Sequence, residues 1–223
     1  MFGPVVNGLE TKVTNRSIEL ATRHVLLLTQ VAFFTSLLWC YILYHGPKLQ
    51  LDGISFFGVF HRTLPIIFIG YLIAMMGLWR TGEYLRSAGI GAFVWTGLRV
   101  VGLSLMVLLA TPFNHGAFFN WAHMTTGVVG ALVQLGITVL LVNTRRTLRS
   151  VSGFVLQLAG GILSAASLPD WHFTYLFTGE VLYQLGFAWC LIEWTYTLRA
   201  RDLSGAPQLV TNAEANDFPP TPA

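Results

Sequence analysis

Residues 24–44 read HVLLLTQVAFFTSLLWCYILY, a run that contains no Asp, Glu, Lys or Arg. As an α-helix, such a run is long enough to cross the roughly 30 Å hydrocarbon layer of a bilayer. The whole chain has the same character: 54% of its residues are hydrophobic and only 10% are charged, against about a quarter in soluble proteins. The sequence therefore predicts an integral membrane protein whose first transmembrane helix is this run.

Five more apolar runs follow, at residues 54–79, 88–110, 119–142, 151–168 and 173–198. Because backbone groups must be paired inside lipid and no barrel alternation is present, the runs predict an all-α, polytopic bundle of six transmembrane helices. The bundle covers residues 24–198 and is compatible with three helical hairpins. Pro65 removes one backbone hydrogen bond early in the second run and predicts a kink there.

The charged segments predict how the bundle is oriented. A polar lead (residues 1–23), the turn at 80–86, the loop at 145–149 and a basic junction at 199–201 fall on one side and hold ten of the thirteen Lys and Arg residues. By the positive-inside rule this side is cytoplasmic. We therefore expect cytoplasmic termini in a plasma or inner membrane, with residues 199–223 forming the basic junction and a proline-rich, disordered cytoplasmic tail.

A His-x-Thr pattern recurs at the predicted outer ends of three helices. SFFGVFHRT at residues 55–63 and AFFNWAHMT at residues 117–125 share two adjacent Phe, a His and a Thr, and WHFT at residues 171–174 keeps the last part. Three imidazoles are the ligand set of a catalytic zinc site. The pattern thus predicts a candidate divalent-metal site from His61, His123 and His172, with Asp170 or Asp52 as an orienting group or base.

Two other interpretations of these histidines stay open. Each ring would lie with its aromatic neighbours in the interfacial belt, while each Thr bonds its own helix backbone. A haem is less favoured than a metal ion, because the chain lacks the second ring of histidines that bis-haem membrane cytochromes use.

Ionisable side chains inside the predicted helices are costly unless they face the bundle or reach the interface. Glu180 lies about two turns from the outer end of the last helix, with Arg62 or His61 as a candidate partner. Arg99 and Glu193 fall in the cytoplasmic half, where a pair between them would lock two helices together. A small proton-coupled transporter that uses Glu180 is therefore one functional alternative.

The run at residues 151–168 is rich in small side chains. One narrow face of it carries Gly153, Gln157, Gly161 and Ala165, with Gly160 and Ser164 alongside. Such a face lets another helix approach closely, and we expect that helix to belong to the same chain.

Several kinds of chemistry find no support in the sequence. Cys40 and Cys190 fall near opposite ends of their helices by depth, so we expect no disulfide between them, and neither belongs to a Cys-x-x-Cys pair. No phosphate loop, nucleophile elbow or nucleic-acid module is present, and no nucleic-acid partner is expected.

The stretch Gly53-Ile54-Ser55-Phe56-Phe57-Gly58, His123 with Gly127 and Gly130, and Glu180 running on to Asp202 resemble the Frag/DRAM/Sfk group and its uncharacterised prokaryotic six-helix relatives. Where members usually carry an acidic residue in the first of these motifs, this chain has Phe56. The resemblance implies a non-enzymatic six-helix membrane protein linked to lipid organisation, membrane trafficking or service as a partner subunit.

The expected function follows from these features. No catalytic motif is evident, so we expect an accessory subunit of a membrane complex or a lipid-associated organiser, with the bilayer and other membrane subunits as partners. A metal-dependent membrane enzyme using the outer histidines and the Glu180 transporter are the alternatives.

Overall fold

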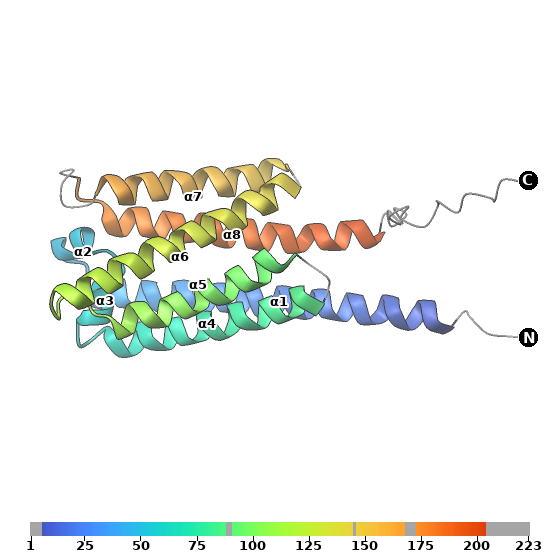
Figure 1. The fold of residues 1–223 in the computed structure, drawn as a ribbon, viewed down its shortest axis with the longest axis horizontal. Coiled ribbons are helices and arrows are strands. Elements are labelled where there is room, and N and C mark those ends of the chain that lie inside the picture. Colours follow the sequence, from blue (N-terminus) through green and yellow to red (C-terminus); the bar gives the residue numbers. More distant parts are fainter. Residues whose placement is uncertain (1–5, 88–90, 145, 168–172, 204–223) are drawn as a thin grey trace, which may run out of the picture.

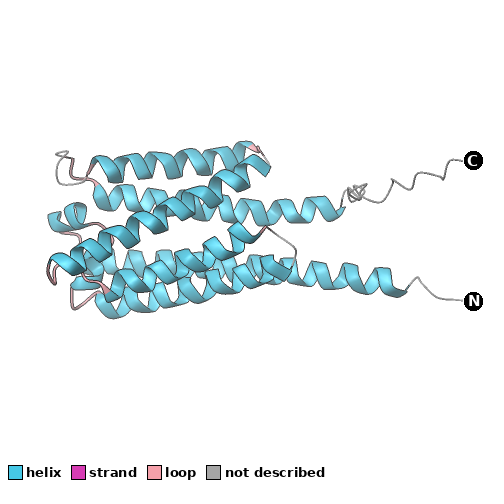
Figure 2. Ribbon diagram, viewed as in Figure 1, coloured by secondary structure: helices cyan, strands magenta, loops and turns pink. Residues whose placement is uncertain are grey.

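The computed structural model of the chain describes residues 6–87, 91–144, 146–167 and 173–203. Within these ranges the regular secondary structure is helical and no strand occurs (Figure 2). In chain order the helices are α1 (Val6–Leu43), α2 (Pro47–Asp52), α3 (Phe56–Val59), α4 (Leu64–Ser87), α5 (Ala92–Ala110), α6 (Ala117–Thr144), α7 (Leu148–Ala166) and α8 (Leu176–Leu203).

Five of these helices are long and apolar enough to cross a membrane: the Leu20–Leu43 part of α1, and α4, α5, α6 and α7. The 28-residue α8 has the length to do so, but Glu180, Gln184 and Glu193 make it more polar. The five apolar helices indicate a multi-pass membrane protein, as the sequence predicted.

Five helices, α1, α4, α5, α6 and α8, form a ring in which neighbours pack together and α8 closes against both α1 and α6. α7 lies outside this ring, packed along α8 (Figure 1). Two buried apolar clusters fill the interior. One includes Phe57, Ile67 and Leu105, and the other includes Leu98 and Ile137.

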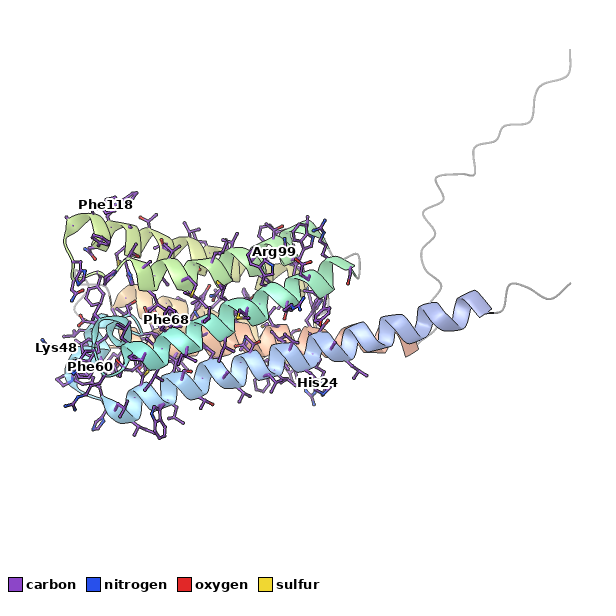
Figure 3. All side chains as sticks on the ribbon, turned by 90° about the horizontal axis from the view of Figure 1, so that it is seen from below. His24, Lys48, Phe60, Phe68, Arg99 and Phe118 are labelled. Atoms are coloured by element: carbon purple, nitrogen blue, oxygen red, sulfur yellow. The ribbon has the colours of Figure 1, made fainter. Side chains whose placement is uncertain are left out.

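The two ends of the bundle differ in character. The start of α1 and the end of α8 lie at one end, and α2 and α3 lie at the other (Figure 1). Arg99 lies toward the first end, whereas Lys48, Phe60 and Phe118 lie at the second (Figure 3). We call the first the basic end, because the end of α4 and the connection from α6 to α7 bring their arginines there, and the second the capped end.

Glycines set the close approach of α7 to α8. A Cβ on Gly160 would overlap the Tyr183 backbone nitrogen, and a Cβ on Gly186 would overlap that of Gln157. The predicted contact of this face with a helix of the same chain is therefore confirmed. Its centre is Gly160 rather than Gly161, because a Cβ on Gly161 would meet only the Tyr183 ring, at 3.2 Å.

The first helix begins earlier than residue 24, where the sequence predicted its start, so most of the polar lead is helical. α1 begins at Val6 and runs without a break to Leu43. No proline interrupts this stretch, and extending an existing helix by a residue costs far less than starting a new one.

The predicted continuous helix over residues 54–79 was also wrong. The chain forms α3, a turn at residues 60–63 and then α4. Pro65 lies in the first turn of α4, where its missing N–H would have had no helical partner. The proline therefore starts a helix and does not kink one.

At the other end of the chain, α8 continues to Leu203 and so extends beyond the predicted end at residue 198. The predicted disordered tail beyond residue 203 lies outside the described residues. Cys40 and Cys190 are free thiols, both buried.

Candidate functional site at the capped end

Residues 47–59 form a short two-helix segment, the outer cap, that covers the capped end of the bundle. Pro47 starts α2 and Gly53 ends it with φ +69°, a conformation that suits glycine. The Gly53 N–H donates to the Leu49 carbonyl at 3.0 Å. Leu49 is 1% exposed and Phe57 is fully buried, so apolar side chains of both short helices anchor the cap in the bundle.

A carboxylate of α8 fastens the middle of the outer cap. Glu180 Oε2 accepts a hydrogen bond from the Ile54 N–H at 2.5 Å. A Cβ on Gly53 would overlap the same oxygen, so glycine is required there for space as well as for its backbone conformation. Half a turn earlier on α8, the Thr178 hydroxyl donates to Gln50 Oε1 at 3.1 Å.

A histidine of α6 fastens the outer cap from another side. His123 is 7% exposed, and its Nδ1 lies 2.8 Å from the Thr111 carbonyl oxygen and 3.1 Å from that of Leu108. Carbonyl oxygens only accept, so Nδ1 carries the proton. In the neutral imidazole Nε2 is then the acceptor for the Ser55 hydroxyl, at 2.7 Å.

The turn that joins the outer cap to α4 has its own polar anchor. The Thr63 hydroxyl donates to the Phe57 carbonyl at 2.9 Å and also lies 3.1 Å from the Phe60 carbonyl. Thr63 is fully buried, so these bonds replace the water that its hydroxyl loses. The expectation was that each Thr of the His-x-Thr pattern bonds the backbone of its own helix; Thr63 instead bonds the end of α3 from the turn that precedes α4.

A small pocket lies where the outer cap meets α4, α5 and α6. Most of its lining is apolar, and the polar groups come from three side chains. Its lining includes Ser55, Gly58, Tyr71, Leu109, Pro112 and His123. The pocket therefore presents the Ser55–His123 pair on a largely apolar wall.

The candidate metal ligands lie in different surroundings and do not form one site among the described residues. His61 is exposed and its ring lies 5.1 Å from that of Phe60, whereas His123 is buried with both ring nitrogens engaged. His172 and Asp170 lie outside the described residues. Among the residues that the structure describes, no three His, Cys, Asp or Glu side chains gather where an ion could bind.

The partners predicted for Glu180 were wrong, because its oxygen bonds the outer-cap backbone while His61 and Arg62 are exposed. Asp52, at the end of α2, is partly buried. Its burial raises the pKa of that carboxyl above its usual value, and the nearby Lys48 ammonium partly offsets the change.

At the basic end, Arg99 pairs with Glu83 rather than with the predicted Glu193. The Arg99 guanidinium lies 5.0 Å from the Trp79 ring centroid and 4.9 Å from that of Trp95. Both rings and the carboxylate come from α4 and α5, so this arginine ties two consecutive helices together. Glu193 instead lines a second small pocket near the start of α7.

Sequence reasoning missed Ser55 and the Ile54 N–H as partners of the buried groups. A signal was present, since Ser55 begins the first His-x-Thr stretch and His123 belongs to the second. The two stretches do meet in space. They meet through unlike residues, a serine and a histidine, and not as equivalent ligands.

No family model, curated protein or solved structure matches the chain. The resemblance to the Frag/DRAM/Sfk group stays a prediction, and the function is inferred from the geometry of the capped end.

Proposed function

We propose that this chain is a six-span membrane protein with cytoplasmic termini that acts within the bilayer as a lipid-associated organiser. The observation that carries the proposal is the capped end, where a small, largely apolar pocket with a few polar groups opens beside the outer cap. Lipids have the same combination of a long apolar part and a compact polar part. No separate soluble domain occurs among the described residues.

Two features support α8 as the sixth span. Its side chains Phe187 and Leu191 belong to the buried core, so its polar residues do not keep it out of the bundle. Its strongest polar group in the outer half, Glu180, already has a backbone partner. A helix whose polar groups are satisfied within the protein can lie in a membrane at moderate cost.

Cytoplasmic termini are supported by the charges at the basic end. Arg80, Arg86, Arg146 and Arg149 are exposed on the last turns of α4 and around the connection from α6 to α7. These segments share an end with the start of α1 and the end of α8 (Figure 1). Positive charge in short loops marks the cytoplasmic side.

An accessory subunit of a larger membrane complex is the second candidate. α7 lies outside the ring and presents apolar side chains outward, among them Val155 and Ile162 at 56% and 69% exposure. Either lipid or another membrane subunit would cover this face. If the protein purified in mild detergent forms a particle larger than one chain and contains a second polypeptide in fixed ratio, this result would favour the accessory-subunit function.

The metal enzyme and the transporter have less support from the geometry. A metal ion at His123 would have to displace the Ser55 hydroxyl from Nε2. A proton carrier at Glu180 would have to exchange its proton while the same carboxylate bonds the Ile54 N–H.

Lipid association is tested by phosphorus analysis of the protein purified in mild detergent. Wild-type protein is expected to keep a fixed number of phospholipids per chain. Leu109→Trp, which fills the pocket, should keep fewer, while Leu103→Trp on the outward face of α5 should match wild type. Equal retention by all three proteins would contradict the proposal.

Elemental analysis of the same samples tests the metal alternative. The proposal expects no stoichiometric metal. One metal ion per chain that disappears in the His61→Ala, His123→Ala, His172→Ala triple variant would replace the organiser with a metal-dependent enzyme.

A further inference from the structure

Ser55 and His123 stand in the relation of a nucleophile to its base. The Ser55 hydroxyl donates to His123 Nε2 at 2.7 Å, within the range in which a histidine takes a proton from an attacking hydroxyl. Ser55 is partly exposed and lines the pocket, whereas the imidazole behind it is buried. A ligand in the pocket therefore meets both the serine oxygen and the imidazole beside it.

Two backbone carbonyls hold the base in its orientation. The carbonyl oxygens of Thr111 and Leu108 both lie within hydrogen-bond distance of His123 Nδ1. They fix the proton on Nδ1 and leave Nε2 free to accept from the serine. In serine hydrolases a carboxylate commonly has this role, and two carbonyl dipoles likewise stabilise the positive charge that develops on the ring.

From this geometry we propose that Ser55 is a nucleophile, activated by His123, that accepts an acyl group from an apolar carboxylic ester. This goes beyond the organiser role, which requires no covalent chemistry. The proposal for Ser55 rests on the pocket and on the Ser55–His123 hydrogen bond alone. It does not require that lipids stay bound during purification.

The position of the pair identifies the substrate class. Near the start of α6, Phe118 and Trp121 are 72% and 67% exposed, as expected for a helix end in the aromatic belt at the membrane interface. His123 lies within two turns of that helix start. This is the depth of the ester linkages of lipids. The small pocket then needs to admit only the ester carbonyl, while the acyl chains remain in the bilayer.

The reaction is an ordinary acyl transfer. The Ser55 oxygen bonds to the carbonyl carbon as its proton moves to His123 Nε2. The carbon–oxygen bond to the alcohol breaks, and the departing alkoxide takes that proton. Water then attacks the acyl-serine and gives a proton to His123. His123 returns that proton to the Ser55 oxygen as the acid leaves, so the net reaction converts the ester and water into an acid and an alcohol.

The same hydrogen bond also ties the outer cap to α6. The test must therefore distinguish a reactive serine from a serine whose hydrogen bond is only structural. A long-chain alkyl fluorophosphonate does so, because it forms a phosphorus–oxygen bond with an activated serine and loses fluoride. Purified wild-type protein is incubated with the probe, and peptide mass spectrometry identifies the modified residue.

We expect one adduct per chain, on Ser55, and none in Ser55→Ala. His123→Gln keeps an acceptor for the Ser55 hydroxyl but is a far weaker base, so its labelling rate should fall by about 10²-fold or more. Ser87 and Ser152, exposed and bonded to their own helices, are the internal controls and should stay unmodified.

Absence of an adduct on wild-type Ser55 overturns the proposal. So does labelling that is as fast in His123→Gln as in wild type, or as fast at Ser87 as at Ser55. Phospholipid retention is measured separately, on wild-type protein that has not met the probe, so the organiser and the nucleophile succeed or fail separately.

Discussion

Ionisable side chains inside a membrane bundle need partners that replace water, and at the capped end these partners are backbone groups and a hydroxyl. Glu180 accepts the Ile54 N–H, and His123 lies between two carbonyls and Ser55. The bonds of Glu180 to Ile54 and of His123 to Ser55 join segments that are far apart in the chain. These residues therefore hold the outer cap in place as well as form the pocket wall.

Removing the carboxylate tests this holding role. Glu180→Ala leaves the Ile54 N–H without its acceptor and is expected to cost about 1–3 kcal/mol of stability, seen as a lower unfolding midpoint in detergent. Glu180→Gln keeps an oxygen and should cost less. Glu193→Ala, at the other end of α8, is the matched control with a smaller effect, and an equal loss in both alanine variants would contradict the role given to Glu180.

Alanine variants at two glycines with positive φ distinguish the cost of backbone strain from the cost of disturbing the contact with Glu180. Gly53→Ala adds a strained conformation and a Cβ that overlaps Glu180 Oε2, whereas a Cβ added at Gly116, where φ is +114°, would meet no described atom within 4 Å. Strain costs each variant about 1–3 kcal/mol. Thermal unfolding should show the larger loss for Gly53→Ala, and equal losses would mean that the carboxylate moves aside freely.

At this scale the sequence predicted which polar residues lie inside the bundle but not what they bind. Glu180 and Arg99 are rare charges in apolar runs, so their importance could be read from hydropathy. Their partners, Ile54 and Glu83, depend on where the chain turns between the helices. Hydropathy contains no information about that, and the predicted pairs with Arg62 and Glu193 failed for this reason.

At the scale of helices, the pair α7 and α8 shows how small residues replace the hydrophobic effect as a cause of packing in lipid. Gly160 of α7 faces Gly179 and Tyr183, and Gly186 of α8 faces Gln157, each at distances too short for a Cβ. The face of α7 was predicted from its spacing. The glycines of α8 are seven residues apart and interrupted by large side chains, so their partner role was not predicted.

A single methyl group tests this interface. A Cβ at Gly186 would overlap the Gln157 backbone nitrogen, so Gly186→Ala should force the helices apart at a cost of about 1–3 kcal/mol. Gly127→Ala is the control in α6, where the nearest atom would be 3.8 Å away. It should be neutral or stabilising by up to about 1 kcal/mol, since alanine favours helix. Unfolding midpoints that fall equally would contradict this packing.

Helix boundaries were the weaker part of the sequence prediction, and Pro65 shows why. Its ring is compatible with the first turn of a helix as well as with a kink, and apolar residues on both sides gave no reason to choose. In the structure the Thr63 hydroxyl donates to the Phe57 carbonyl. This bond stabilises the turn between the end of α3 and the start of α4. That bond requires the tertiary structure around it.

At the scale of the whole molecule, the bundle has a basic end with the chain's helical termini and a capped end with the pocket (Figure 1). Apolar run lengths were sufficient to predict an all-helical, multi-pass protein, because the bilayer imposes the same length on every span. The ring order, the position of α7 outside it and the fold of the outer cap come from side-chain packing, which run lengths do not encode.

The most direct test of this account is the side of the membrane on which each end lies. Lys48→Cys at the capped end and Arg146→Cys at the basic end are exposed positions, while the native Cys40 and Cys190 are buried and should give little background. A membrane-impermeant maleimide is applied to intact cells and to permeabilised cells. Six spans with cytoplasmic termini predict labelling of Lys48→Cys in intact cells and of Arg146→Cys only after permeabilisation. Labelling of both positions from the same side, or the reverse pattern, would contradict the account.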